Sequence, residues 1–459
     1  MKMEDKPLEK FFKLKENGTD VRTEITAGIT TFMTMAYILA VNPSILGDAG
    51  MDTGAVFTAT ALASAIGCLC MALMANLPFA LSAGMGLNAF LAYTVVLQMG
   101  YSWEVALAAV FVEGIIFIIL SLTNVREAIF NAIPTTLKLG VSVGIGLFIC
   151  FIGLQNAHLV VDSSTLVSIF SFSGSIKNGT FATEGITAVL ALVGIILTSY
   201  LVIKNVRGNI LIGIVATWLI GIVCQLVGLY VPAPEAGYYS LIPSGILSAP
   251  SSLAPTFLKL DFSAIGSFNF FAVMFSFLFV DLFDTLGTLI GCASKADMLD
   301  KDGKLPAIKG ALMADAVATT AGALLGTSTV TTFVESSSGI AEGGRTGLTA
   351  ITTGALFVLA LFFSPIFLTI PSFATAPALI VVGFLMMQQV VKISWDDTLE
   401  AIPAYIAIFA MPFMYSISEG ISLGIISYVI LHLCAKKTKD ISPLMYVLAV
   451  VFVLKYILL

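Results

Sequence analysis

The chain has 459 residues, of which 58% are hydrophobic and only 11% are charged, with a formal net charge of −6 at pH 7. Soluble domains carry about 25% charged residues, so this composition excludes a soluble globular protein and indicates a membrane protein with many spans. The two histidines lie far apart and the six cysteines form no CxxC pair, so we expect no metal site, no cofactor and no enzymatic activity.

Residues 1–23 are polar and charged and lack an apolar core, so we expect a tail and no cleavable signal peptide. Apolar stretches then follow one another along the chain, many of them close to the 20 or so residues that a membrane-spanning helix needs. We recognise about fourteen, near 25–46, 54–77, 79–97, 103–122, 135–156, 187–203, 208–230, 270–293, 308–326, 328–345, 347–371, 376–392, 400–416 and 420–436. The last apolar segment, 443–459, is either a further span or an interfacial helix.

Lysine and arginine residues recur in alternate turns between these spans. If every predicted span crosses the membrane, these turns lie on the side of the N-terminal tail; their residues include Lys204, Arg207, Lys309, Lys392 and Lys436. Because cytoplasmic loops are enriched in Lys and Arg, we expect a multi-pass protein of the plasma membrane with a cytoplasmic N-terminus. The loops 157–186 and 231–267 are poor in these residues and are expected outside.

Two of the predicted spans have an irregular composition. The third contains a cluster of small residues from Ser82 to Gly86, followed by Asn88. The tenth begins with a stretch rich in Thr, Ser and Val, which favours extended chain, and continues with Glu335. Irregular backbone at membrane depth occurs only where protein or a water-filled cavity covers it. We therefore expect both segments to lie inside the protein.

These two spans occupy matching positions if the chain consists of two repeats of seven spans. A similarity between 207–221 and 419–433, the seventh and the fourteenth spans, favours the same division. An odd number of spans inverts the second repeat, and interrupted spans at matching positions of inverted repeats predict a transporter binding site. The alternative, that 326–347 is a loop between two spans, stays open on the sequence alone.

The eighth predicted span, within 268–293, carries an acidic face in an apolar run. Asp281, Asp284, Thr285 and Thr288 have the spacing i, i+3, i+4 and i+7, which places all four on one side of a helix. Ionisable residues inside a membrane are a functional-site hypothesis by default. The carboxylates indicate a transporter for a ligand that donates hydrogen bonds, with or without a proton.

Four stretches resemble the AzgA-like purine permeases of the nucleobase–cation symporter-2 group. They are EITAGITTFMTMAYILAVNPSIL (24–46), GMGLNAFLAYTVV (84–96), FVDLFDTLGTLIG (279–291) and ESSSGIAEGGRTGLTA (335–350). The resemblance implies an all-α polytopic membrane protein of fourteen transmembrane segments in two inverted repeats of seven, with short strands in the third and tenth spans. It also implies a core domain formed by 24–122 and 268–371, and a gate domain formed by 123–267 and 372–459.

The same resemblance implies uptake of a purine base with protons, by alternating access between core and gate. The substrate-binding positions of the family match an asparagine of the third span and acids of the eighth and tenth. The acidic face adds a threonine, and a phenylalanine ring can cover a face of the base. The candidate substrate-binding residues are Asn88, Asp281, Asp284, Thr285, Glu335 and Phe333.

The coupled proton is expected on a carboxylate, because burial raises the proton affinity of an acid. The candidates are Asp281, Asp284, Glu335, Glu113 and Asp315. The last two lie within the fourth and ninth predicted spans. Each of these two either joins a proton path or holds core helices together by hydrogen bonding.

The sequence does not choose among guanine, hypoxanthine and adenine. We favour guanine/hypoxanthine:proton symport, with adenine:proton symport as the alternative. An anion transporter on the same architecture is a rival hypothesis, disfavoured because acids aimed at the ligand would repel an anion. The expected partners are a small-molecule purine, protons and the lipid bilayer, without nucleic acid, and a homodimer is left open.

Overall fold

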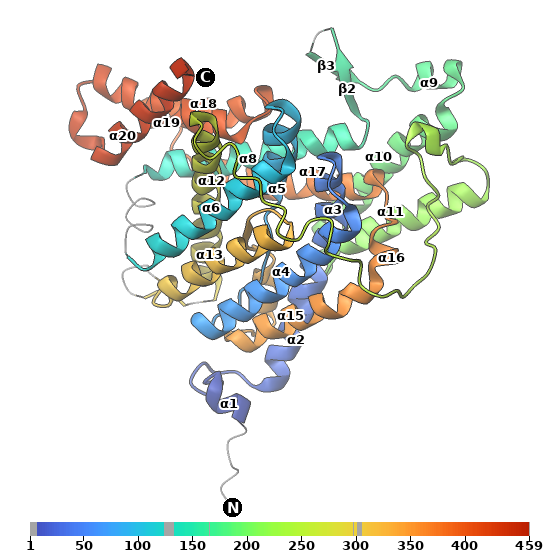
Figure 1. Ribbon diagram of the computed structural model, residues 1–459, viewed down its shortest axis with the longest axis horizontal. Coiled ribbons are helices and arrows are strands. Elements are labelled where there is room, and N and C mark those ends of the chain that lie inside the picture. The colour runs from blue at the N-terminus through green and yellow to red at the C-terminus, as the bar shows by residue number, and fades with distance from the viewer. Residues whose placement is uncertain (1–6, 124–132, 165, 297, 301–304, 459) are drawn as a thin grey trace, which may run out of the picture.

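The computed structural model describes residues 7–123, 133–164, 166–296, 298–300 and 305–458. Within these residues the chain is mainly helical, as the sequence predicts (Figure 1). Among them, eleven helices are long and apolar enough to cross a membrane, and three shorter apolar helices accompany them, Met85–Gln98, Thr398–Phe413 and Pro443–Leu454. The chain is therefore a multi-pass membrane protein.

In chain order the elements are α1 (Pro7–Phe11), α2 (Val21–Met35), α3 (Ile38–Asp48), α4 (Thr53–Met74), β1 (Leu81–Ala83), α5 (Met85–Ala89), η1 (Phe90–Gln98), α6 (Trp103–Ser121), α8 (Thr135–Asn156), β2 (Val160–Ser163), β3 (Leu166–Ile169), α9 (Phe172–Asn178), η2 (Phe181–Gly185), α10 (Ile186–Ile203), α11 (Asn209–Leu226), η3 (Pro234–Ala236), α12 (Phe268–Lys295), α13 (Ile308–Leu325), β4 (Val330–Thr332), α14 (Ser336–Ala341), α15 (Gly347–Ala360), η4 (Leu361–Phe363), α16 (Ser364–Phe367), α17 (Ser372–Met387), η5 (Gln388–Lys392), α18 (Thr398–Phe413), α19 (Ile417–Cys434), η6 (Thr438–Asp440) and α20 (Pro443–Leu458). The predicted third span corresponds to a strand followed by α5 and η1, and the predicted tenth to β4 and the six-residue α14. These interruptions are why neither reaches the length of a spanning helix.

The helices pack in two groups. In the first group α4 packs against α13 and α15, while α13 also contacts α6, α15 contacts α2, and α12 contacts α6. In the second group α8 packs against α17, α18 and α19, while α10 contacts α11 and α17. We call these the first helix group (α2, α4, α6, α12, α13, α15) and the second helix group (α8, α10, α11, α17, α18, α19).

Glycines set the close approach of α8 and α17 in the second helix group. A Cβ on Gly146 would lie 2.8 Å from the carbonyl oxygen of Gly383, and a Cβ on Gly383 would lie 2.5 Å from that of Gly146. Small residues let membrane helices approach at backbone distance. A larger side chain at either position would separate the two helices.

Two short strands meet inside the protein. β1 and β4 pair antiparallel, with Leu81 opposite Thr332 and Ala83 opposite Val330, and all six residues are buried. The backbone N–H of Gly84 donates to Thr329 O at 3.0 Å, which extends the pairing by one step. The strands lie in the two segments whose composition is irregular, so 326–347 is a strand and a helix packed in the interior and not a surface loop.

A buried glutamate joins the first span to α15. The side chain of Glu24 is fully buried, and its carboxylate accepts backbone N–H bonds from Arg345 at 2.8 Å, Thr346 at 3.2 Å and Thr349 at 3.1 Å. The hydroxyl of Thr349 donates to the same carboxylate at 2.7 Å. The first backbone N–H groups of a helix have no partner within it, so Glu24 caps α15 from α2.

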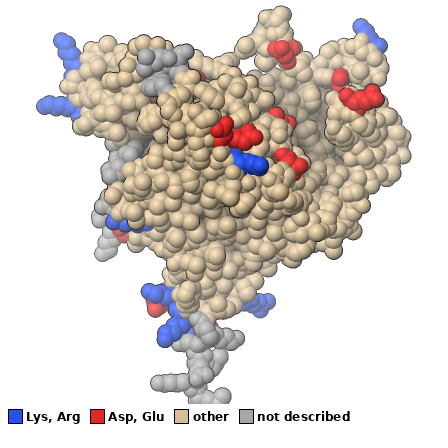
Figure 2. Space-filling model, viewed as in Figure 1, with Lys and Arg blue, Asp and Glu red and all other residues tan. Residues whose placement is uncertain are grey.

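The connecting segments differ between the two ends of the molecule. The β2–β3 hairpin and α9 project from the helices at the upper right of Figure 1, whereas α1 and the N-terminus lie at the bottom. On the face in Figure 2, most Lys and Arg side chains lie at the lower and left-hand edges, and most Asp and Glu side chains lie at the centre and upper right. The charges are therefore distributed unevenly over the surface.

Candidate functional site

The acidic face of α12 lies against the paired strands. α12 contacts β4, α6 and α14. Asp281 and Thr285 are fully buried, and Asp284 is half-buried. The helical spacing that brings these side chains to one face thus directs them into the protein, as the sequence predicts.

Asp281 is linked to Asp315 through a single hydroxyl. The Oγ1 atom of Thr285 lies 2.9 Å from Oδ1 of Asp281 and 2.8 Å from Oδ1 of Asp315, and all three side chains are 0% exposed. A hydroxyl has only one proton to donate. Both contacts are therefore hydrogen bonds only when one of the two carboxyl groups is protonated and donates to the threonine oxygen.

The extended segment before and within β4 supplies hydroxyl donors to the other acids. Thr329 Oγ1 donates to Glu113 Oε2 at 3.1 Å, and Thr331 Oγ1 donates to Asp284 Oδ2 at 3.3 Å. Alternate residues of extended chain point to the same side. Thr329 and Thr331 therefore point to the same side of this segment, where one bonds to Glu113 on α6 and the other to Asp284 on α12.

Asn88 follows β1 on α5 and is fully buried. Its Oδ1 atom accepts a hydrogen bond from Ser328 Oγ, while its Nδ2 atom has no hydrogen-bond partner in the protein. If the amide is turned over, the nitrogen meets the serine and the oxygen is left without a partner. In either orientation one polar atom of a buried amide stays unpaired, which is costly unless a ligand or water pairs with it.

Glu335 precedes α14 and is half-buried. Its Oε1 atom accepts a hydrogen bond from the hydroxyl of Tyr37 at 2.6 Å. Phe333, two residues earlier, is 6% exposed, and its backbone N–H donates to Ala80 O at 2.9 Å.

The predicted residues therefore fall into two sets. Asp284 and Glu335 are partly exposed. The others are buried, namely Asn88, Glu113, Asp281, Thr285, Asp315 and Phe333. The sequence alone did not identify the hydrogen-bond partners of these residues. They are Tyr37 for Glu335, Ser328 for Asn88, Thr329 for Glu113 and Thr331 for Asp284. In the described residues no group of three or more His, Cys, Asp or Glu side chains is arranged to hold a metal ion.

The comparison with known proteins bears on this geometry. A model described as a permease family matches residues 22–423. The chain is 46% identical over 461 residues to the guanine/hypoxanthine permease PbuG of Bacillus subtilis. The alignment covers 98% of this chain and 99% of that protein. The chain belongs to the nucleobase–cation symporter family of permeases. It is also 43% identical over 453 residues to the adenine permease AdeP of Escherichia coli, with 98% and 96% covered.

Solved structures with the same fold are more distant in sequence. The transmembrane domain of the bicarbonate transporter BicA of a cyanobacterium has a TM-score of 0.63 at 15% identity, over 87% of this chain and 97% of that one. The murine anion transporter Slc26a9 has a TM-score of 0.60 at 14% identity, over 90% of this chain and 68% of that one. At this identity the likeness is one of fold alone. As a member of a permease family, the chain is a transporter and not an enzyme.

Proposed function

We propose that this permease carries purine bases, guanine or hypoxanthine in the first place, together with a proton. The observation that carries the proposal is the set of groups attached to one irregular segment. Asp284 and Glu335 are partly exposed residues that offer carboxylates, and Asn88 offers an unpaired amide atom, all contacting or belonging to residues 328–335. The names of the relatives supply the purine class.

The chemistry of the base favours guanine and hypoxanthine. An ionised carboxylate only accepts hydrogen bonds, so it suits a ligand edge with N–H donors. Guanine presents a ring N–H beside an exocyclic amine, which is a pair of donors for one carboxylate, and its carbonyl can accept from the amide of Asn88. Adenine is the second candidate, because relatives named adenine permeases are 43% and 40% identical to the chain.

We place the coupled proton on the Asp281–Thr285–Asp315 group. The hydroxyl between the two acids favours a state with one proton, as argued above from the two distances. Asp284 and Asp281 are three residues apart on the same face of α12, so a base bound at Asp284 is adjacent to the proton. Protonation of this group before binding would lower the charge that the base meets.

The packing of the helices supports fourteen spans in two inverted repeats. With α2–α3 as the first span and α12 as the eighth, helix contacts occur in symmetric pairs. The second span packs on the eleventh (α4 on α15), and the equivalent pair in the other repeat, the ninth and the fourth (α13 and α6), also packs together. In the same way the sixth span packs on the twelfth (α10 on α17), and its equivalent, the thirteenth, packs on the fifth (α18 on α8). We identify the first helix group with the core domain (24–122 and 268–371) and the second with the gate domain (123–267 and 372–459), and propose alternating access between them.

We place the protein in the plasma membrane with residues 1–23 in the cytoplasm. One observation supports this orientation, the recurrence of Lys and Arg in alternate turns along the chain. The β2–β3 hairpin then lies outside.

Uptake of labelled guanine, hypoxanthine and adenine by a host that lacks purine uptake tests the function. We expect uptake of guanine and hypoxanthine, and Asp284→Asn should weaken the apparent affinity about 10- to 150-fold, since a hydrogen bond to a charged group contributes about 1.5–3 kcal/mol. The matched control is Asp396→Asn, which makes the same change at an exposed position. Normal surface expression without uptake of any purine would refute the proposal.

A further inference from the structure

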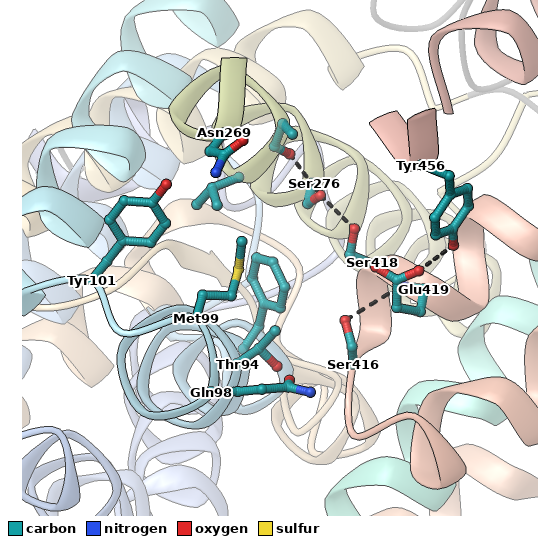
Figure 3. Close-up of a pocket in the computed structure, with 13 residues that line it drawn as sticks. Thr94, Gln98, Met99, Tyr101, Asn269, Ser276, Ser416, Ser418, Glu419 and Tyr456 are labelled. Atoms are coloured by element: carbon teal, nitrogen blue, oxygen red, sulfur yellow. Dashed lines mark hydrogen bonds between the residues drawn. The ribbon is translucent and has the colours of Figure 1, made fainter. Parts of the chain in front are cut away.

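A pocket lies apart from the acids of the candidate site, where the beginning of α12 faces α19 (Figure 3). Its volume is about 410 Å³, within the range of about 300–1,000 Å³ that is usual for small-molecule sites. Its wall includes Thr94 and Gln98 from η1, Asn269 from α12, and Ser418 and Glu419 from α19. None of the candidate substrate-binding residues lines it.

The pocket lies between the two helix groups. The hydroxyls of Ser276 on α12 and Ser418 on α19 are 2.7 Å apart, and Thr94 Oγ1 donates to Tyr415 O at 3.2 Å. A molecule in this pocket would therefore contact both α12 and α19. The wall of the pocket is complete only when α12 and α19, one from each helix group, lie side by side as they do here.

The pocket and the candidate substrate site share the third predicted span. Phe90 forms part of the pocket wall and packs edge-to-face on Phe277, with ring centroids 4.9 Å apart. Asn88 is two residues before Phe90 in the chain. The unpaired amide of the inner site and a residue of the pocket wall therefore lie two residues apart on one short helical segment.

The groups in the wall suit a planar heterocycle with both donors and acceptors. The amides of Gln98 and Asn269 each offer a donor and an acceptor, and Glu419 offers an acceptor, while Tyr101 and Tyr456 offer ring faces. Figure 3 shows Asn269 and Tyr101 on one side of the space, and Gln98 and Thr94 below it. Among the lining residues that the structure describes there is no Lys or Arg, which disfavours an anion.

We propose that this pocket is a second, outer binding site for the purine base, which holds the base on its way to Asp284 and Glu335. The proposal rests on the proposed function, because it takes the transported base as the ligand. This outer site is additional to the inner site at Asp284 and Glu335, and none of the acids of the inner site contributes to it. The amides of Gln98 and Asn269 are its recognition groups, and the two helix groups form it jointly.

Equilibrium binding of labelled hypoxanthine to the purified full-length protein tests this site. We expect about two bound bases per chain, and about one in the double variant Gln98→Leu/Asn269→Leu. The apparent KM for hypoxanthine uptake should rise about 2- to 12-fold for each lost neutral hydrogen bond. The variant Gln388→Leu, which makes the same change at an exposed glutamine, is the matched control and should keep both sites.

The number of bases bound per chain of the wild-type protein tests the outer site without any variant. Hypoxanthine uptake together with one bound base per chain would overturn the outer site and leave the transport function intact. The same holds if the double variant keeps the wild-type KM and stoichiometry. A wild-type protein that neither binds nor carries any purine would overturn the proposed function, and the outer purine site with it.

Discussion

Replacing Thr285 by valine is expected to weaken proton coupling while leaving base binding in place. The valine has nearly the same shape but no hydroxyl, so Asp281 and Asp315 lose the group that lies 2.9 and 2.8 Å from them. With one proton on the pair, two hydrogen bonds are lost; with no proton, only one is lost. The singly protonated state therefore loses one more hydrogen bond, from the neutral carboxyl group to the threonine oxygen, about 0.5–1.5 kcal/mol, which weakens proton loading about 2- to 12-fold.

Two assays separate coupling from binding. Accumulation of labelled hypoxanthine at external pH 7 should fall in Thr285→Val, and should recover when the external pH is lowered by up to about one unit. Exchange of labelled for unlabelled base, which needs no net proton movement, should persist. Thr285→Ser keeps the hydroxyl and should behave like the wild-type protein.

The reasoning would be refuted by a Thr285→Val protein that accumulates base with the wild-type pH profile. Loss of both accumulation and exchange in Thr285→Ser and Thr285→Val alike would also contradict it, because the serine retains the donor.

Three further predictions concern the site and the packing. Tyr37→Phe removes the donor 2.6 Å from Glu335 and should raise the KM about 10- to 150-fold, whereas Tyr405→Phe, at an exposed position, should leave it unchanged. Cysteines at Ala83 and Val330 face each other across the strand pair and should cross-link; persistent failure with reagents of several lengths would contradict the pairing. Gly146→Ala should destabilise the protein by about 1–3 kcal/mol in a thermal unfolding assay, and Gly266→Ala, where nothing lies within 4 Å of the added Cβ, should not.

Much of the architecture could be predicted from local chemistry. The length of the apolar stretches predicts a multi-pass membrane protein, and the Thr, Ser and Val residues of 327–332 predict extended chain, where β4 lies. The spacing of Asp281, Asp284 and Thr285 gives their common face. In each case the signal is the residue pattern of one segment, so no long-range information is needed.

The accessibility of the acids could not be predicted in the same way. Asp281 and Asp284 are three residues apart and look equivalent in sequence, yet the first is fully buried and linked to Asp315 through Thr285, and the second is half-buried. The difference arises from the segments that pack against α12, among them α6, β4 and α14, and this packing between distant segments is not visible in a local pattern. The same holds for Glu24, a buried acid whose partners are backbone N–H groups some 320 residues away.

Reconstituted vesicles test the central claim, coupling of a purine to protons, most directly. The purified protein in vesicles with an alkaline interior and no sodium should concentrate labelled hypoxanthine or guanine. A protonophore should abolish this accumulation, and an imposed sodium gradient alone should not support it. Accumulation that survives the protonophore and requires sodium would contradict proton symport and leave the purine site intact.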